Sequence, residues 1–256
     1  MKKIMLRKFR VDIVRLKTDF CITKMMDIHS LNWEATYETL NQKGFAILPK
    51  VLSPAECQHL AGLYGDCGLY RATINMKRYR FGVGEYKYFS YPLPPVIQVL
   101  REMFYSPLCG LANDWMHQLD IKTDFPHHHR DLILQCRDNN QMRPTPLMLR
   151  YETGGFNTLH QDLYGDVYFP FQIIFVLTQP GRDHVGGELI LTEQIPRAQS
   201  KAAVLQPNQG DALILTTNFR PAMGARGYYR SKMKHGVSEV KSGVRYSLGI
   251  IFHDAA

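Results

Sequence analysis

The chain has few cysteines, and their arrangement excludes two common kinds of site. Its 256 residues include five cysteines, an odd number, and no two of them form a Cys-x-x-Cys motif. Neither a disulfide framework nor a cysteine-based zinc site is therefore expected, and reduced thiols are typical of a cytoplasmic protein. No stretch reaches 18 consecutive apolar residues, so no membrane-spanning helix is predicted. Low-complexity tracts and fixed-period repeats are also missing from the sequence.

The positive charge of the chain is concentrated at its beginning. The formal net charge is +8, and residues 1–24 hold eight cationic and two acidic side chains, a net charge of +6 that leaves only +2 for the remainder. Charged residues interrupt the apolar positions of this segment, so it lacks the continuous apolar stretch of a secretory signal. We expect residues 1–26 to be a basic, weakly ordered extension. The overall charge does not by itself indicate nucleic acid.

The half of the chain before residue 147 has mainly helical patterns. Apolar residues recur at helical spacing over 31–43, with Ser30 as the expected N-cap. Ser53-Pro54-Ala55-Glu56 has the form of a capping box, which predicts a helix that runs to about Tyr64. The other expected elements are a strand over 45–48, a hairpin or lid over 70–92, a helix over 94–120 broken near Pro107, and a polar connection over 121–146 with His127-His128-His129 in a solvated loop.

From Leu147 onward the pattern changes to short strands separated by turns. Eight such strands favour a double-sheet jelly roll, so the expected fold class is α+β: a double-stranded β-helix, cupin-like, with the helical half packed on it. No linker separates the halves, and we expect one domain over 27–256, with helical support over 27–146 and the jelly-roll core over 147–256. The expected strands cover 147–152, 157–162, 170–178, 187–192, 202–206, 211–216, 235–240 and 244–252.

His160-Gln161-Asp162 is the first candidate for a metal site. Side chains two apart in a strand point to the same face, so His160 and Asp162 can bind one ion together. A third ligand is available in His235, 73 residues after Asp162. A jelly roll places the second and seventh strands, which carry these residues, side by side. Two histidines and one carboxylate form the facial triad of non-haem Fe(II) oxygenases, although zinc could occupy the same ligands.

Arg245 and Ser247 favour iron over zinc. They alternate on the last expected strand and so face the same way. An arginine fork binds a carboxylate through two hydrogen bonds, and the serine hydroxyl can add another. The open positions of a facial triad can chelate a 2-oxo acid. Arg245 would then hold the far carboxylate of 2-oxoglutarate, with O₂ as the second co-substrate.

Together with this constellation, the chain resembles the 2-oxoglutarate- and Fe(II)-dependent dioxygenase superfamily, in particular its prolyl-hydroxylase-like wing. From about Met26 to the end it resembles a prokaryotic family of uncharacterised oxygenases proposed to demethylate damaged nucleic acid. The resemblance implies hydroxylation of a substrate C–H bond with release of succinate and CO₂, and it implies that Tyr151 also touches 2-oxoglutarate. The motifs are Tyr151-x-x-Gly-x-x-x-x-x-His160, Gly186-Gly-Glu-Leu189, Gly210-Asp-Ala212, His235-Gly-Val-Ser238, Gly82-Val-Gly-Glu-Tyr-Lys-Tyr-Phe-Ser-Tyr-Pro-Leu-Pro94 and Gly249-Ile-Ile-Phe-His-Asp-Ala255.

The stretch from Arg71 to Tyr91 is the candidate for substrate recognition. Cations interleaved with aromatic rings suit a nucleic-acid strand, and the alternative is a packed hairpin with solvated charges. One departure keeps a second function open. Alkylation-repair dioxygenases carry a further arginine four residues after the 2-oxoglutarate Arg-x-Asn motif. The corresponding region here, Arg245-Tyr-Ser-Leu-Gly249-Ile, has no second arginine, so a protein (prolyl-type) or small-molecule hydroxylase is the alternative. The candidate substrate residues are Arg71, Lys77, Arg78, Arg80, Tyr86 and Tyr88.

Overall fold

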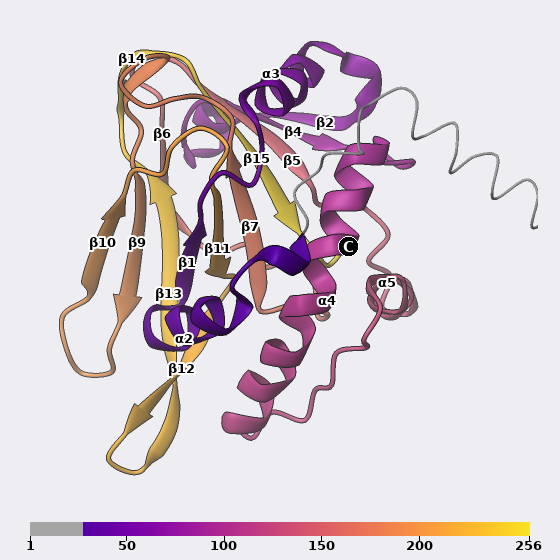
Figure 1. Ribbon diagram of the computed structural model, residues 1–256, viewed down its shortest axis with the longest axis vertical. Coiled ribbons are helices and arrows are strands. Elements are labelled where there is room, and N and C mark those ends of the chain that lie inside the picture. Colours follow the sequence, from indigo (N-terminus) through magenta and orange to yellow (C-terminus); the bar gives the residue numbers. More distant parts are fainter. Residues whose placement is uncertain (1–27) are drawn as a thin grey trace, which may run out of the picture.

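Two antiparallel sheets and a layer of helices make up residues 28–256, the part of the chain that this computed structural model describes (Figure 1). The expected extension over 1–26 lies outside the described residues. None of the described helices has both the length and the apolar composition needed to cross a membrane. The helical elements are η2 (Ile28–Ser30), α2 (Trp33–Lys43), α3 (Pro54–Gly62), η3 (Leu63–Gly65), η4 (Cys67–Leu69), η5 (Met76–Tyr79), α4 (Pro95–Gln118) and α5 (His129–Asp138).

The two large sheets share the jelly-roll strands between them. The seven-stranded sheet has the order β1-β11-β7-β15-β5-β4-β2, and the second has the order β10-β9-β13-β6-β3, with β12 paired to β13. A small pair, β14 and β8, stands apart. The strands are β1 (Phe45–Leu48), β2 (Tyr70–Asn75), β3 (Gly82–Val83), β4 (Glu85–Phe89), β5 (Leu147–Tyr151), β6 (Phe156–His160), β7 (Phe171–Val176), β8 (His184–Gly186), β9 (Leu189–Gln194), β10 (Lys201–Leu205), β11 (Ala212–Thr216), β12 (Phe219–Gly224), β13 (Gly227–Val237), β14 (Val240–Gly243) and β15 (Arg245–Ile251).

Alternation along the central strands creates two cores on opposite faces of the seven-stranded sheet. In β7, Ile173 and Phe175 face the helices, where α4 lies along the outer side of the sheet (Figure 1). Ile174, between them, faces the second sheet. Each fully buried side chain of this size contributes roughly 1.5–3 kcal/mol to folding. Because the helix-side core joins residues from both halves of the chain, it supports our proposal that 27–256 form one domain.

Local signals account for the starts of the early helices. The capping box at the start of α3 is confirmed: the Ser53 hydroxyl accepts from the backbone N–H of Glu56, and the Glu56 carboxylate accepts from that of Ser53. The expected cap of α2 is wrong. Asn32, not Ser30, accepts from the Ala35 backbone N–H, because the helix begins two residues later than its apolar pattern.

Two helices differ from expectation. The predicted break near Pro107 is wrong, since α4 continues through this residue. The buried residues Phe104 and Leu108 pack this part of the helix against the core, and the Tyr37 hydroxyl donates to the Pro107 carbonyl. Tertiary packing therefore outweighs the hydrogen bond that proline removes. The connection over 121–146 contains α5, which was not predicted because its apolar residues form a single stripe in an otherwise polar sequence. His129, predicted in a solvated loop, begins α5 and is buried.

The β-strand pattern missed one hairpin. Residues 219–234 form β12 and most of β13, which pair antiparallel, whereas only 235–240 was expected as a strand here. Pro221 made a strand over these residues unexpected, because proline cannot donate a hydrogen bond to a neighbouring strand. However, β12 pairs only with β13, and an edge strand of this kind tolerates proline. The predicted hairpin over 70–92 is present, but it is not a separate lid. Its strands β2 and β4 extend the seven-stranded sheet through β5, so the N-terminal half is less purely helical than expected.

Candidate functional site

The two candidate histidine ligands lie opposite each other on neighbouring strands. His160 ends β6, and His235 lies in β13, with the two residues paired in antiparallel register. Their ring centroids are 4.3 Å apart. The jelly-roll pairing thus brings together two side chains that are far apart in the sequence, as the strand assignment predicted.

Asp162 completes the cluster from a loop. β6 ends at His160, two residues short of the predicted strand end, and Asp162 follows in irregular structure. Asp162 Oδ1 lies 3.6 Å from His160 Nε2, and Asp162 Oδ2 lies 3.2 Å from His235 Nε2. One ligand atom from each residue lies within 4.8 Å of the others, which is the separation that a single metal ion requires. Among the described residues this is the one such cluster of at least three His, Cys, Asp or Glu side chains.

Hydrogen bonding and burial prepare these groups for a cation. His160 Nδ1 lies 2.8 Å from the Thr158 carbonyl, which can only accept, so Nδ1 carries the proton and Nε2 presents its lone pair. Burial, followed by the charge of His235, lowers the pKa of His160 and favours the neutral ring. Burial opposes ionisation of Asp162, but the hydrogen bond and charge of His235 outweigh it and hold the carboxyl pKa well below its usual range. Neutral imidazole and ionised carboxylate are the forms that bind metals.

Arg245 brings an unpaired positive charge into the same cavity. It lies at the start of β15 with only 3% of its surface exposed, and its guanidinium forms no ion pair with any carboxylate in residues 28–256. Nη1 donates to the Ser247 hydroxyl at 3.1 Å, and Cζ lies 5.6 Å from the Tyr151 ring centroid. The Tyr151 hydroxyl is buried without a well-formed hydrogen bond. An isolated buried charge is costly, so this corner of the cavity is suited to an anionic ligand.

Gly187 allows the backbone to pass close to this arginine. Its φ of +73° is one that glycine adopts readily, and a Cβ built there would lie 2.8 Å from Arg245 Cδ. The two glycines of this motif thus have packing reasons: Gly187 leaves room for the arginine stem, and a Cβ at Gly186 would clash with the Glu239 carbonyl oxygen.

The predicted substrate residues on the hairpin separate into two groups. Tyr86 and Tyr88 are half-buried and buried, and Tyr88 packs edge-to-face against Tyr164. Arg71 lies with its guanidinium 4.5 Å above the Tyr88 ring and donates to the Pro144 carbonyl. Tyr88 is thus part of the packed hairpin, whereas Arg71 is exposed and Tyr86 half-buried, and contact of these three side chains with substrate stays a prediction.

The second group lies on the exposed turn between β2 and β4. Lys77, Arg78 and Arg80 are exposed and form no ion pair with a described carboxylate. Sequence reasoning passed over Tyr79 and Phe81, the two aromatic residues that alternate with these cations. Their rings stack with centroids 5.8 Å apart and planes 17° apart, yet about half of each side chain is exposed, at 49% and 47%. We call these five residues the turn platform.

The turn platform is attached to the strand that carries His160. The Phe81 carbonyl accepts hydrogen bonds from the Thr158 backbone N–H and hydroxyl, both at 2.8 Å. Thr158 precedes His160 by two residues, a separation of about 7 Å along a strand. The backbone of the turn platform is therefore bonded to β6 two residues before His160.

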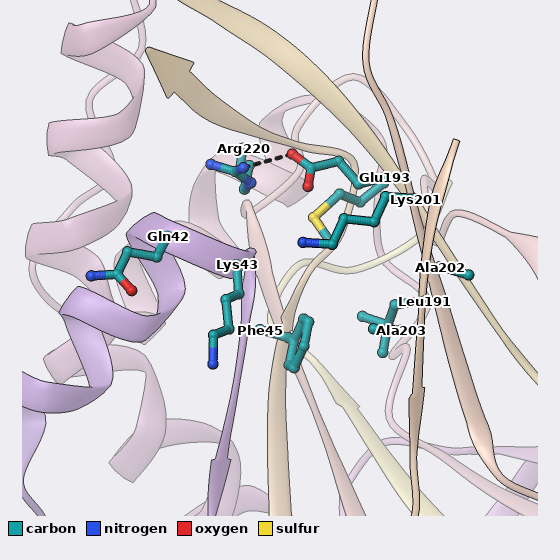
Figure 2. Close-up of a pocket in the computed structure, with 10 residues that line it drawn as sticks. Gln42, Lys43, Phe45, Leu191, Glu193, Lys201, Ala202, Ala203 and Arg220 are labelled. Carbon is teal, nitrogen blue, oxygen red and sulfur yellow. Dashed lines mark ion pairs between the residues drawn. The ribbon is translucent and has the colours of Figure 1, made fainter. Parts of the chain in front are cut away.

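A larger cavity lies elsewhere in the described residues. It measures about 310 Å³, against about 40 Å³ for the cavity that contains the histidine–aspartate cluster, and the two share no lining residue. Figure 2 shows this larger cavity beside α2, where Lys43 and Lys201 line it and Arg220 pairs with Glu193 at 2.7 Å. It contains no cluster of metal ligands. Ligand chemistry, not volume, therefore identifies the functional site.

Comparison with solved structures agrees with this reading of the fold. A prolyl-4-hydroxylase from Pseudomonas putida has a TM-score of 0.53 at 14% identity, with 88% of this chain and 99% of that chain covered. An oxidoreductase of the 2OG-Fe(II) oxygenase family from Burkholderia pseudomallei has a TM-score of 0.53 at 13% identity, covering 89% and 94%. The predicted double-stranded β-helix is confirmed. The fold and the residue set define a 2-oxoglutarate- and Fe(II)-dependent oxygenase.

A family comparison narrows this class. Residues 84–255 match a family of oxygenases described as catalysing oxidative methylation of damaged DNA, and this chain belongs to that family. An uncharacterised protein, Rv2227, from Mycobacterium tuberculosis H37Rv is 42% identical over 197 residues, which cover 77% of this chain and 79% of the relative. The same figures hold for the uncharacterised protein MT2286 from strain CDC 1551. The expected Fe(II), 2-oxoglutarate and O₂ are confirmed as the cofactor and co-substrates of this enzyme class.

Proposed function

We propose that His160, Asp162 and His235 hold Fe(II), and that Arg245 binds the far carboxylate of 2-oxoglutarate. The carrying observation is the buried Arg245 guanidinium without a carboxylate partner, in the same cavity as three metal-ligand side chains. A dicarboxylic co-substrate supplies the missing negative charge. Ser247 and Tyr151 then add hydrogen bonds from either side of the guanidinium.

The chain's own part in the reaction is positioning. Fe(II), when bound, supplies the oxidising chemistry that inserts one oxygen atom of O₂ into a substrate C–H bond while the other enters succinate. The His160 imidazole presents a fixed lone pair, since the hydrogen bond from Nδ1 sets its tautomer. The apolar side chains around the site, such as Leu149 and Ile174, limit the access of water to the reacting groups.

For the substrate we propose single-stranded nucleic acid that carries an N-methyl lesion. The supporting feature is the turn platform: stacked, half-exposed Tyr79 and Phe81 between three unpaired cations. Bases stack on exposed aromatic rings and phosphates are attracted to the flanking cations. Hydroxylation of an N-methyl carbon gives an unstable product that breaks its C–N bond and releases formaldehyde, so the base is left without the methyl group.

Fluorescence anisotropy with a labelled single-stranded oligonucleotide tests the platform. We expect the double variant Tyr79→Ala/Phe81→Ala to bind about 10- to 100-fold more weakly, because stacking contributes about 1–3 kcal/mol per base. Tyr228→Ala is the matched control, since Tyr228 is a 44% exposed tyrosine on the basic β12–β13 hairpin. Three phosphate contacts predict roughly a 20-fold loss of affinity between 50 and 200 mM salt.

Substrate-dependent succinate formation then separates the two functions that the sequence left open. The nucleic-acid function predicts that a methylated oligonucleotide raises turnover above the uncoupled rate and yields formaldehyde. Turnover raised by a prolyl peptide or a metabolite, with no response to oligonucleotides, would establish the alternative hydroxylase. If the double variant binds the oligonucleotide as tightly as the wild-type protein, the turn platform has no part in substrate recognition.

A further inference from the structure

The three candidate ligands are not supported equally by the fold. Register pairing between β6 and β13 fixes the backbones of His160 and His235. Asp162 instead lies in residues 161–170, a connection to β7 without helix or strand. A carboxylate on irregular backbone needs side-chain partners to keep one orientation, because no strand ladder restricts it.

Tyr164 supplies that partner. Its hydroxyl lies 2.7 Å from Asp162 Oδ1, while Asp162 Oδ2 faces His235 Nε2 at 3.2 Å. An ionised carboxylate can only accept, so Tyr164 is the donor. Oδ1 is therefore engaged by a phenol and lies 3.6 Å from His160 Nε2, whereas Oδ2 has no hydroxyl donor among the described residues and lies closer to a ring nitrogen, that of His235.

A second tyrosine sets the orientation of the first. Tyr88 and Tyr164 have their hydroxyl oxygens 3.0 Å apart, and their rings meet edge-to-face at 88° with centroids 6.1 Å apart. Because the Tyr164 proton points to Asp162, Tyr88 must donate to Tyr164. Tyr88 belongs to β4 and pairs in register with Leu147, so the chain of hydroxyls begins on a rigid strand.

The backbone of Tyr164 is held from the other end of the chain. The Ala256 N–H donates to the Tyr164 carbonyl at 3.0 Å. Gln141 braces the same connection, since its amide donates to the carbonyls of Val167 and Asp254. The C-terminal residues and Gln141 thus restrict a loop that has no hydrogen-bond ladder of its own.

We propose that Tyr164 is a positioning residue that restricts Asp162 to binding iron through Oδ2 alone, and that Tyr88 orients Tyr164 for this role. The proposal rests on the proposed function, since it takes Asp162 as an iron ligand. Because the Asp162 carboxylate then cannot rotate, its second oxygen does not occupy a further coordination position of the metal. That position remains open for co-substrates.

Anaerobic titration of the full chain with Co(II), a spectroscopic substitute for Fe(II), tests this inference. We expect Tyr164→Phe to weaken Co(II) binding about 10- to 100-fold, the usual effect of losing a partner of a metal ligand. We also expect its visible d–d bands to change in intensity, because the freed carboxylate can bind through both oxygens. Tyr88→Phe keeps the Tyr164 donor and should weaken binding only about two- to fivefold, which tests the inference separately if Tyr164→Phe fails to fold.

Tyr168→Phe is the matched control, because it removes a hydroxyl from the same connection, and Tyr168 packs against Phe219. It should bind Co(II) as the wild-type protein does. Wild-type affinity and unchanged bands in Tyr164→Phe would overturn the positioning role while leaving the proposed iron site intact. Absence of Co(II) binding by the wild-type protein would instead overturn the proposed function and, with it, this inference.

Discussion

Arg101 and Arg245 are both buried arginines, and they differ in what surrounds them. Arg101 lies on α4, fully buried, with Nη2 2.8 Å from Asp254 Oδ1 and further bonds to the Ile251 and Phe252 carbonyls. Arg245 is 3% exposed and has only the Ser247 hydroxyl and the Tyr151 ring. The first guanidinium is satisfied by the protein, and the second is not.

This difference separates a structural charge from a functional one. Burial alone is the same for both side chains, so burial does not identify a site. The missing carboxylate partner identifies the site. A buried charge without a partner lowers the stability of the fold, and a bound anionic ligand can offset that cost. Three substitutions or conditions test whether the two regions differ in this way.

The largest expected effect is on folding at Arg101. Arg101→Met leaves Asp254 as a buried carboxylate that keeps only the Tyr91 hydroxyl, so the free energy of unfolding should fall by about 3–5 kcal/mol. Urea denaturation followed by circular dichroism measures it. The double variant Arg101→Met/Asp254→Leu should recover part of the loss. A single variant as stable as the wild-type protein would show that this ion pair is not structural.

The next effect is on ligand binding at Arg245. Arg245→Met should lose about 2–3 kcal/mol of 2-oxoglutarate binding, roughly 30- to 150-fold, because the far carboxylate loses its charged partner. The free energy of unfolding should stay equal or rise, since an unpaired buried charge is replaced by an apolar chain of similar length. Anaerobic calorimetry with Mn(II)-loaded protein measures the first quantity. Destabilisation as large as that of Arg101→Met would make Arg245 a structural residue instead.

The smallest expected effect of a single side chain is the acid sensitivity of each buried histidine near Arg101. Burial, followed by the charge of Arg101, lowers the pKa of His129 to about 3 and that of His253 to about 3. The unfolded chain binds these protons near pH 6.5, so stability falls as the pH drops from about 6.5 toward 3. Each histidine should contribute about 2 kcal/mol of loss between pH 7 and 5. Denaturation curves at pH 7 and 5 measure it, and His129→Gln should show a shallower pH dependence; an unchanged slope contradicts this origin.

Much of the fold followed from local pattern, and the exceptions share a cause. The eight predicted strands each correspond to an observed strand, because period-two alternation is local. The unbroken α4, the helix α5 and the strand β12 were missed. In each of them, burial against distant elements outweighed a local signal from proline or from polar composition.

The candidate site divides in the same way. Residue type and sequence spacing were enough to select His160, Asp162 and His235 as metal ligands and Arg245 as the carboxylate-binding residue. Residue type determines which atoms can bind a metal or a carboxylate. The same reasoning selected Tyr86 and Tyr88 as substrate residues and passed over Tyr79 and Phe81. Exposure separates these pairs, and exposure depends on the β4–β5 pairing, which joins residues about 60 apart in the sequence.

By itself the sequence determined the chemistry available to this protein: two imidazoles, a carboxylate and an arginine in the jelly-roll half of the chain. Only the tertiary structure decided that Arg245 has no carboxylate partner among the described residues, that the Tyr164 hydroxyl bonds to Asp162, and that the stacked pair Tyr79 and Phe81 is exposed. The physical reason is that donor chemistry belongs to a side chain alone. Partnership and exposure belong to contacts between segments that are distant along the chain.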